Sequence, residues 1–415
     1  MKFIADLHLH SKYSRATSSR MELETLAKWA KIKGIKVLGT GDFTHPEWLK
    51  ELKEKLEPAE PGLFKLKNEN ETRFLLTTEL NFVFYKERKL RKVHLLVFAP
   101  SFEIVEKINT QLGWIGNLEV DGRPTLKADA KELMKIVLNI CENCLIVPAH
   151  LWTPYFGLLG SKSGFDSIEE CFEEYSKYIF AGETGLSSDP AMNWRLSALD
   201  KITLISCSDA HSPENIGREA NVFDLEDLSF MGIIEAIKAK DPQRFLYTIE
   251  FYPQEGKYHY DGHRNCGISL HPKETKKFRG ICPVCGRPLT IGVLNRVEQL
   301  ADREEGFVPE NAIPFKSLIP LREIIAEALG MEKSANRVLQ EYKRLIENFG
   351  SEFKILLEVN RQKLETLTLP EIAEGILRAR EGKVFIEPGY DGVYGKIRIF
   401  SKEEKGEISR QKTLF

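Results

Sequence analysis

Short apolar runs alternate with amphipathic segments over roughly the first 225 residues. The runs are rich in β-branched and aromatic residues, and the amphipathic segments have apolar positions at helical spacing. We expect strands at residues 3–10, 36–41, 74–84, 92–98, 144–150, 178–185 and 203–209, and helices at 21–32, 46–56, 128–140 and 168–175. Alternation of this kind predicts a parallel sheet. About seven strands with polar residues after nearly all of them favour a barrel over an open sheet.

The pattern changes near residue 251 and again near residue 294. Residues 251–295 are rich in Cys, His, Gly and Pro, whereas helical periodicity returns at 318–329, 333–348, 349–361 and 369–381. A strand, a glycine-rich loop and a strand follow at 382–400, and a charged tail ends the chain. We therefore expect an α/β barrel at 1–250, a zinc-binding module at 251–295, and a mainly helical, DNA-binding domain with a terminal hairpin at 296–415.

Composition narrows the class of protein only slightly. A formal net charge of −2 neither supports nor excludes binding to nucleic acid. The chain has no apolar run of membrane-spanning length and begins directly with a predicted strand, so we expect a soluble, cytoplasmic protein with no membrane partner. Seven cysteines in 415 residues favour metal binding or buried thiols over a disulfide framework.

The first predicted strand carries two histidines, His8 and His10, at alternate positions. Alternate residues of a strand project from the same face, so both imidazoles can bind one metal ion. A pair of half-exposed histidines without a metal is the alternative. The later strands must therefore decide between the two interpretations.

Potential metal ligands occur at or just after every predicted strand of the first half. They are His8 and His10, Asp42 and His45, Glu79, His94, His150, Glu183, and Asp209 with His211. In a barrel the carboxyl ends of the strands converge on one face, where active sites are built. Singly, His94 is compatible with a core histidine and Asp42 with a turn cap. Together these residues predict a metal centre.

The type of ligand indicates the chemistry. Histidine with carboxylate, and no cysteine, favours Zn, Mn, Fe or Mg in an open site over a closed structural zinc site. Eight or nine ligands are too many for one ion, but a carboxylate such as Glu79 can bridge two ions that hold a hydroxide nucleophile. Asp42 is better suited to orienting a histidine. Clusters of this kind hydrolyse phosphate esters.

The cysteine-rich segment contains a second candidate metal site. Cys282 and Cys285 have the Cys-x-x-Cys spacing of a zinc knuckle between Pro and Gly residues, and Cys266 supplies a third sulfur. The fourth ligand is either His263, which gives His-x-x-Cys, or His271. The mirrored spacing favours His263. We expect one structural zinc ion here, because so small a segment needs a metal to hold its shape; a metal-free loop is the alternative.

Five motifs occur in the order of the polymerase and histidinol phosphatase (PHP) phosphoesterase superfamily, which the first half of the chain resembles. They are Asp6-Leu-His-Leu-His-Ser11, Gly41-Asp-Phe-Thr-His45, the strand residue Glu79, Pro148-Ala-His150 and Ser208-Asp-Ala-His211. The resemblance implies a distorted (β/α)7 barrel with two or three divalent ions, Zn, Mg or Mn. Ser14-Arg15-Ala16-Thr17 stands where the superfamily often has an acidic residue or histidine. The third metal is therefore left open unless Glu183 serves it, and Arg15 could instead hold a phosphate.

The full order of barrel, Cys/His segment, helical region and the ending Glu387-Pro-Gly-Tyr-Asp-Gly-Val-Tyr-Gly395 resembles the endonuclease Q family of DNA repair enzymes, known from archaea and some bacteria. This resemblance implies incision 5′ to a deaminated base, such as hypoxanthine, uracil or xanthine, or to an abasic site. A sliding clamp is a further expected partner. Candidate DNA contacts are Arg15, Trp114 as a wedge in the loop 109–125, Trp152, Tyr155, Lys162, Arg195, Tyr390 and Tyr394.

Two rival functions remain at this point. A small-molecule phosphatase resembling histidinol phosphatase would use the same barrel but leaves the C-terminal region without a task. A non-catalytic DNA-binding scaffold would have a degenerate barrel, and the intact ligand set argues against it.

Overall fold

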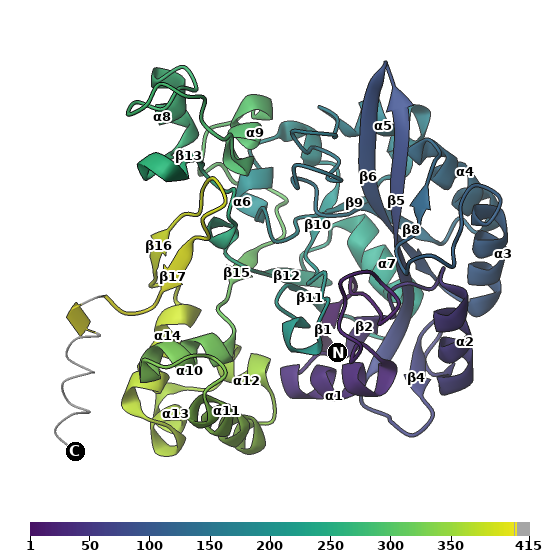
Figure 1. Cartoon of the computed structure of the whole chain (residues 1–415). Helices are drawn as coiled ribbons and strands as arrows, with labels where there is room; N and C mark the ends of the chain where they lie inside the picture. The colour runs from purple at the N-terminus through teal and green to yellow at the C-terminus, as the bar shows by residue number, and fades with distance from the viewer. Residues whose placement is uncertain (402, 405–415) are drawn as a thin grey trace. The chain divides into compact units, whose positions relative to one another are not determined.

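The structure, a computed structural model, describes residues 1–401, 403 and 404 (Figure 1). Two compact units divide the chain: Met1–Lys31, Ile35–Glu250 and Val293–Lys316 form the first, and Ile32–Gly34, Phe251–Gly292 and Ser317–Phe415 the second. Residues 251–292 thus group with the helical region, and 293–316 with the barrel. The predicted division into three domains remains a prediction. Most of the predicted charged tail lies outside the described residues.

Seven strands of the first unit build the predicted barrel. They are β1 (Lys2–Asp6), β2 (Val37–Gly39), β5 (Arg73–Lys86), β6 (Lys89–Ala99), β8 (Leu145–Pro148), β9 (Ala181–Glu183) and β10 (Thr203–Ile205). Parallel pairing joins β1 to β2, β2 to β5, and β9 to β10. β6 pairs with β5 on one side and with β8 on the other. The strands predicted from the apolar runs are all confirmed.

Two hydrogen bonds beyond the strand ends close the barrel. The amide of Leu151, after β8, donates to the carbonyl oxygen of Glu183 in β9 at 2.9 Å. The amide of His10, after β1, donates to the carbonyl oxygen of Ala210, after β10, at 3.0 Å. The segments that carry the predicted ligands therefore also complete the barrel.

One strand corrects the prediction of a parallel sheet. β6 runs antiparallel to both β5 and β8. The physical reason is the two-residue turn between β5 and β6, where Glu87 and Arg88 have φ angles of 52° and 62°. Positive φ at both turn positions is the conformation that joins twisted strands into a tight hairpin. Figure 1 shows this long hairpin extending past the other strands of the barrel.

Helices and further strands surround the barrel. The helices of this unit are α1 (Leu23–Lys33), α2 (Pro46–Lys55), α3 (Phe102–Leu112), α4 (Ala130–Ile140), α5 (Ile168–Phe172), α6 (Pro190–Asn193), α7 (Phe230–Ala239) and α9 (Val293–Leu300). The added strands are β3 (Leu56–Pro58), β4 (Phe64–Leu66), β7 (Thr125–Leu126), β11 (Ala220–Asp224), β12 (Phe245–Glu250) and β15 (Phe315–Ser317). The predicted loop 109–125 begins inside α3, which ends at Leu112.

The main core of the first unit joins the barrel strands to α7. Buried apolar residues from β1, β2, β6 and β8 pack in one cluster with Phe230, Ile233, Ile234 and Ile237 of α7. Burial of such side chains contributes about 1.5–3 kcal/mol each.

The second unit contains the Cys/His segment and the helical region. Its elements are β13 (Asp261–His263), β14 (Ile268–Leu270), α8 (Pro272–Lys277), α10 (Leu321–Leu329), α11 (Asn336–Phe349), α12 (Glu352–Leu357), α13 (Arg361–Leu367), α14 (Pro370–Arg380), β16 (Phe385–Glu387) and β17 (Lys396–Arg398). The predicted terminal hairpin is the antiparallel pair β16–β17. The helix α13 was not predicted: apart from Arg361, it lies between the expected helices 349–361 and 369–381. None of the helices in the described part of the chain is long and apolar enough to span a membrane.

Candidate active site

The first group of side chains lies where β1 and β10 end. His8 and His10 are buried, and their Nε2 atoms lie 3.7 Å and 3.3 Å from Oε2 of Glu79. Oδ1 of Asp209 lies 3.7 Å from Nε2 of His8 and 3.1 Å from Nε2 of His10. One ligand atom from each of the four residues lies within 4.8 Å of all the others. This donor set fits a single divalent cation.

A second group shares Glu79 with the first. Oε1 of Glu79 lies 2.7 Å from Nδ1 of His94 and 3.0 Å from Nε2 of His150. Glu79 therefore presents a different carboxylate oxygen to each group, the arrangement that a carboxylate bridging two metal ions requires. His150 and Asp209 have φ angles of 30° and 47°. Positive φ at residues other than glycine is costly and is concentrated at functional sites.

Polar side chains behind the histidines determine which ring nitrogen faces each group. Nδ1 of His10 lies 3.0 Å from Oδ1 of Asp42, and Nδ1 of His8 lies 2.9 Å from Oε1 of Glu183. Oε2 of Glu183 also accepts the backbone N–H of His150 at 2.8 Å. Contacts of this kind orient metal-binding histidines. Asp42 thus makes the contact that its predicted orienting role requires, and Glu183 occupies an equivalent position behind His8; the orienting role itself remains a prediction.

The carboxylates and histidines of the centre shift one another's pKa values. Burial by itself would lower the pKa of His8, but the surrounding carboxylates, Glu183 foremost, raise it well above the ordinary value. Burial would raise the pKa of Glu79, yet positive charge and hydrogen bonds from the surrounding histidines hold it well below the ordinary value. Burial lowers the pKa of His94 to about 4, so this imidazole is neutral and able to donate a lone pair.

Three predicted ligands lie outside these two groups. Glu183 faces His8, as described; His45 precedes α2, and its ring stacks on Tyr13 at 4.5 Å between centroids. Nδ1 of His211 lies 2.8 Å from the backbone oxygen of Asp209. Ligand roles for these three residues remain predictions.

Ser14 stands in the place of the acid that the superfamily often uses for a third metal. Its hydroxyl donates to Oδ2 of Asp42 at 2.9 Å and lies 3.1 Å from Nδ1 of His10. Within residues 1–401, 403 and 404, no third group of histidine and carboxylate ligands accompanies the two in the barrel. A third metal ion therefore remains without a ligand group of its own.

Two of the residues predicted to contact DNA, Trp152 and Arg195, are buried and have structural roles instead. Trp152 is fully buried, and its indole N–H donates to Oδ1 of Asn193 at 2.8 Å. Arg195 is buried and pairs with Glu298. These two placements correct the sequence-based expectation, which had no means of distinguishing a buried aromatic or arginine from an exposed one. Tyr390 is half-buried with its ring close to Gly262, and its assignment remains a prediction.

The other candidate DNA contacts are exposed. Trp114 is 75% exposed, Tyr155 55% and Tyr394 69%, and Arg15 and Lys162 are also on the surface. Exposure is necessary for contact with DNA but does not demonstrate it. These five assignments remain predictions.

The Trp152 placement leads to a test. We expect Trp152→Phe to destabilise the protein by about 1–3 kcal/mol, because Oδ1 of Asn193 loses a buried donor, and to leave lesion preference unchanged. Urea unfolding and incision assays measure the two effects. Tyr155→Phe is the control and should leave stability within about 0.5 kcal/mol of the parent, because Tyr155 is exposed. Unchanged stability with altered lesion preference in Trp152→Phe would contradict the assignment.

Arg123, which was not predicted as a site residue, lies beside Glu79. Nη1 of Arg123 is 2.9 Å from Oε2 of Glu79. The available signal was the run Asp121-Gly-Arg-Pro124, a lone cation between two turn-forming residues in the loop that also carries Trp114.

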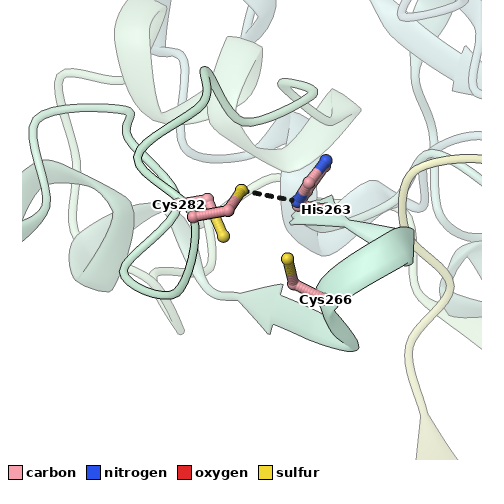
Figure 2. Close-up of side chains that lie close together, drawn as sticks. His263, Cys266 and Cys282 are labelled. Atoms are coloured by element: carbon pink, nitrogen blue, oxygen red, sulfur yellow. Dashed lines mark hydrogen bonds between the residues drawn. The ribbon is translucent and has the colours of Figure 1, made fainter.

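The Cys/His segment brings four further potential ligands together. They are His263, Cys266, Cys282 and Cys285, whose ligand atoms all lie within 4.8 Å of one another. Figure 2 shows the labelled side chains of His263, Cys266 and Cys282 directed toward a common point. The Nδ1 atom of His263 is 3.4 Å from Sγ of Cys285. Three sulfurs and one nitrogen suit a structural zinc ion.

His271 does not belong to this cluster. Its side chain accepts the amide of Lys273 at 3.3 Å and so caps the first turn of α8. The structure therefore decides the open choice of fourth residue in favour of His263.

Although burial acts in the opposite direction, the backbone amides of Cys285 and Val284 lower the pKa of Cys282 to about 6. A thiol ionised at neutral pH is prepared for metal binding.

Two solved structures of known proteins are similar to this chain over nearly its whole length. The crystal structure of the lesion-specific endonuclease PfuEndoQ from Pyrococcus furiosus is 31% identical, with a TM-score of 0.86, over 98% of this chain and 99% of that one. An endonuclease Q in complex with a 27-mer duplex carrying an abasic lesion at the active site is 32% identical, with a TM-score of 0.84, over 97% and 98%.

The C-terminal region matches a family model, and about three quarters of the chain is similar to a part of a longer protein. A family model described as the MJ0043 C-terminal domain matches residues 320–383. The MJ0043 protein of Methanocaldococcus jannaschii is 32% identical over 322 residues, which are 76% of this chain and 37% of that protein. The match thus covers little more than a third of MJ0043.

The barrel and its shared carboxylate define the class of protein. A seven-stranded α/β barrel with histidine and carboxylate groups at the carboxyl ends of its strands is a PHP-type metallophosphoesterase fold. Within this class the chain belongs to the endonuclease Q family, whose members are metal-dependent DNA endonucleases.

Proposed function

We propose that this enzyme cuts one strand of DNA on the 5′ side of a deaminated base, such as hypoxanthine, uracil or xanthine, or of an abasic site. One observation carries the proposal: a single buried glutamate, Glu79, presents one oxygen to each of two ligand groups at the carboxyl ends of the barrel strands. The full-length similarity to an endonuclease Q bound to an abasic duplex supports DNA as the substrate. Incision would leave 3′-hydroxyl and 5′-phosphate ends.

The donor sets assign the residues that would hold the metal ions. His8, His10, Glu79 and Asp209 would bind one divalent ion, and Glu79, His94 and His150 a second. Zn, Mg and Mn are the candidate ions. When bound, such ions supply Lewis-acid activation of the phosphodiester and of water.

The protein's own contribution is orientation and charge. Asp42 and Glu183 hold the imidazoles of His10 and His8, so that their Nε2 atoms face the centre. Neutral His94 and ionised Glu79 keep their donor atoms available at neutral pH. Because the centre is buried, its charges interact more strongly than they would in water.

Recognition of the damaged base would use the exposed side chains around the site. Base pairs weakened by deamination are the least costly to open, which favours the extrusion of the lesion from the stack. Trp114, in the loop that follows α3, is suited to fill the space that the extruded base leaves. Lys162 and Arg15 are candidates for contacts to phosphate groups. A sliding clamp as a partner also remains a prediction.

The test is incision of labelled duplexes that carry hypoxanthine, uracil, an abasic site or only normal pairs, in Mg²⁺ or Mn²⁺. We expect a single nick 5′ to each lesion and no cutting of the normal duplex. Asp209→Ala should lose incision and retain DNA binding. Turnover of a small phosphate monoester without nicking at any lesion would contradict the proposal and favour a phosphatase.

A further inference from the structure

Arg123 places a positive charge beside Glu79, the carboxylate that both ligand groups share. Its Nη1 atom lies 2.9 Å from Oε2 of Glu79, the oxygen that also faces His8 and His10. Glu79 is completely buried, whereas the side chain of Arg123 is 25% exposed. Arg123 is therefore accessible to solvent, whereas the carboxylate that it contacts is not.

The loop around Arg123 is anchored on both sides. Oδ1 of Asp121 accepts the amide of Arg123 at 3.0 Å, and the amide of Asn81 in β5 donates to the backbone oxygen of Pro124 at 3.1 Å. Backbone hydrogen bonds on either side of one residue limit where its side chain can extend. The position of the guanidinium is thus built into the fold.

Gly122 brings this loop into direct contact with the orienting groups of the centre. A Cβ at Gly122 would lie 2.4 Å from both Oδ2 of Asp42 and Oγ of Ser14. Its amide donates to the backbone oxygen of Tyr13 at 3.1 Å. Only a residue without a side chain allows this approach. The loop therefore packs directly against Asp42, the carboxylate that contacts His10.

Most hydrogen-bonding capacity of Arg123 is not used by the protein. A guanidinium has five N–H donors. In the part of the chain that the structure describes, only Nη1 contacts an acceptor, Oε2 of Glu79. A residue serving only to neutralise Glu79 gains most from a two-pronged contact with both carboxylate oxygens. Here the remaining donors are left for a second anion.

From this geometry we propose that Arg123 is a catalytic residue that binds a non-bridging oxygen of the phosphate group at which the strand is cut. The inference rests on the proposed phosphodiesterase function of the centre. Planar paired donors match a phosphate better than the point charge of a lysine does. Negative charge increases on the phosphate oxygens during hydrolysis, and a preplaced donor stabilises that charge.

The test compares Arg123→Gln and Arg123→Lys with the parent protein, all loaded with Mn²⁺. Inorganic phosphate is the probe, and its affinity is measured from the shift in thermal unfolding midpoint. We expect phosphate binding to be lost in Arg123→Gln and weakened in Arg123→Lys, with the same Mn²⁺ content per chain. The single-turnover incision rate should fall roughly 10²–10³-fold in Arg123→Gln.

Lys28→Gln is the matched control, because it removes one positive charge from the exposed face of α1. It should bind phosphate as the parent does. If Arg123→Gln retains phosphate affinity, the inference is overturned and Arg123 is only the counter-ion of Glu79. Should Arg123→Gln fail to fold, Arg123→Lys decides: phosphate affinity equal to that of the parent overturns the inference. The parent protein could also bind phosphate through Arg123 and yet cut no lesion. That outcome would contradict the proposed function but would still support a phosphate site at Arg123.

Discussion

Replacing Glu79 by Gln is expected to lower the single-turnover incision rate by roughly 10³-fold or more, corresponding to about 4 kcal/mol of lost transition-state stabilisation. Both ligand groups contain this residue, through different oxygens. A carboxamide has one oxygen and no negative charge, so it cannot bridge two cations. Metal content per chain after gel filtration should fall together with the rate, and elemental analysis measures it.

Glu183→Gln is the matched control for this change. Glu183 is as deeply buried as Glu79, but it contacts Nδ1 of His8, on the side of the imidazole away from Glu79. An orienting group of this kind typically contributes 10–100-fold to metal affinity or activity. We therefore expect Glu183→Gln to recover full metal content at saturating metal. Equal losses in the two variants would make Glu183 a ligand, and an active Glu79→Gln enzyme would contradict the bridging role.

Loss of metal from the Cys/His cluster is expected to unfold the segment that holds it. The strands β13 and β14 have three residues each and α8 has six, too few to be stable alone. Structural zinc sites contribute roughly 10–16 kcal/mol of binding energy at neutral pH. In Cys282→Ser we expect loss of zinc and of hydrogen-exchange protection over residues 261–290, with metal retained in the barrel.

The effect should extend to the loop that carries Tyr394. Asp391, in the same loop, accepts the hydroxyl of Thr290 at 2.5 Å and the amide of Arg264 at 2.7 Å. Disordering residues 261–290 removes both donors, so exchange protection should also fall at residues 388–395. Cys141→Ser is the control, because this half-buried cysteine follows α4 and is not part of the cluster. Full protection of residues 261–290 in zinc-free protein would contradict the prediction.

The elements of the barrel were predictable because buried strands and helices have characteristic local patterns of apolar residues. Apolar runs marked all seven strands, and alternation within the first run placed His8 and His10 on one face. The remaining predicted ligands could be found because they lie within those runs, as Glu79 and His94 do, or close to the ends of them. The spacing of Cys282 and Cys285 likewise indicated a metal site from local sequence alone.

The direction of β6 depended on a turn rather than on a pattern of burial. Strand direction is set by the connection, and Glu87 and Arg88 adopt positive φ without the Asn or Gly that usually marks such a turn. An apolar run followed by another is equally compatible with either direction. The hairpin could therefore be recognised only in the folded chain.

Tertiary structure alone decided which side chains meet, because the partners are far apart in sequence. His8 and Glu183 are separated by 175 residues, and Glu79 and Arg123 by 44. Closure of the barrel placed Glu183 behind His8 and Arg123 beside Glu79, and packing buried Trp152 and Arg195. Residue type and local spacing thus indicated a metal-dependent phosphoesterase, whereas the positions of Asp42, Glu183 and Arg123 around the two ligand groups arise from long-range contacts that no local pattern records.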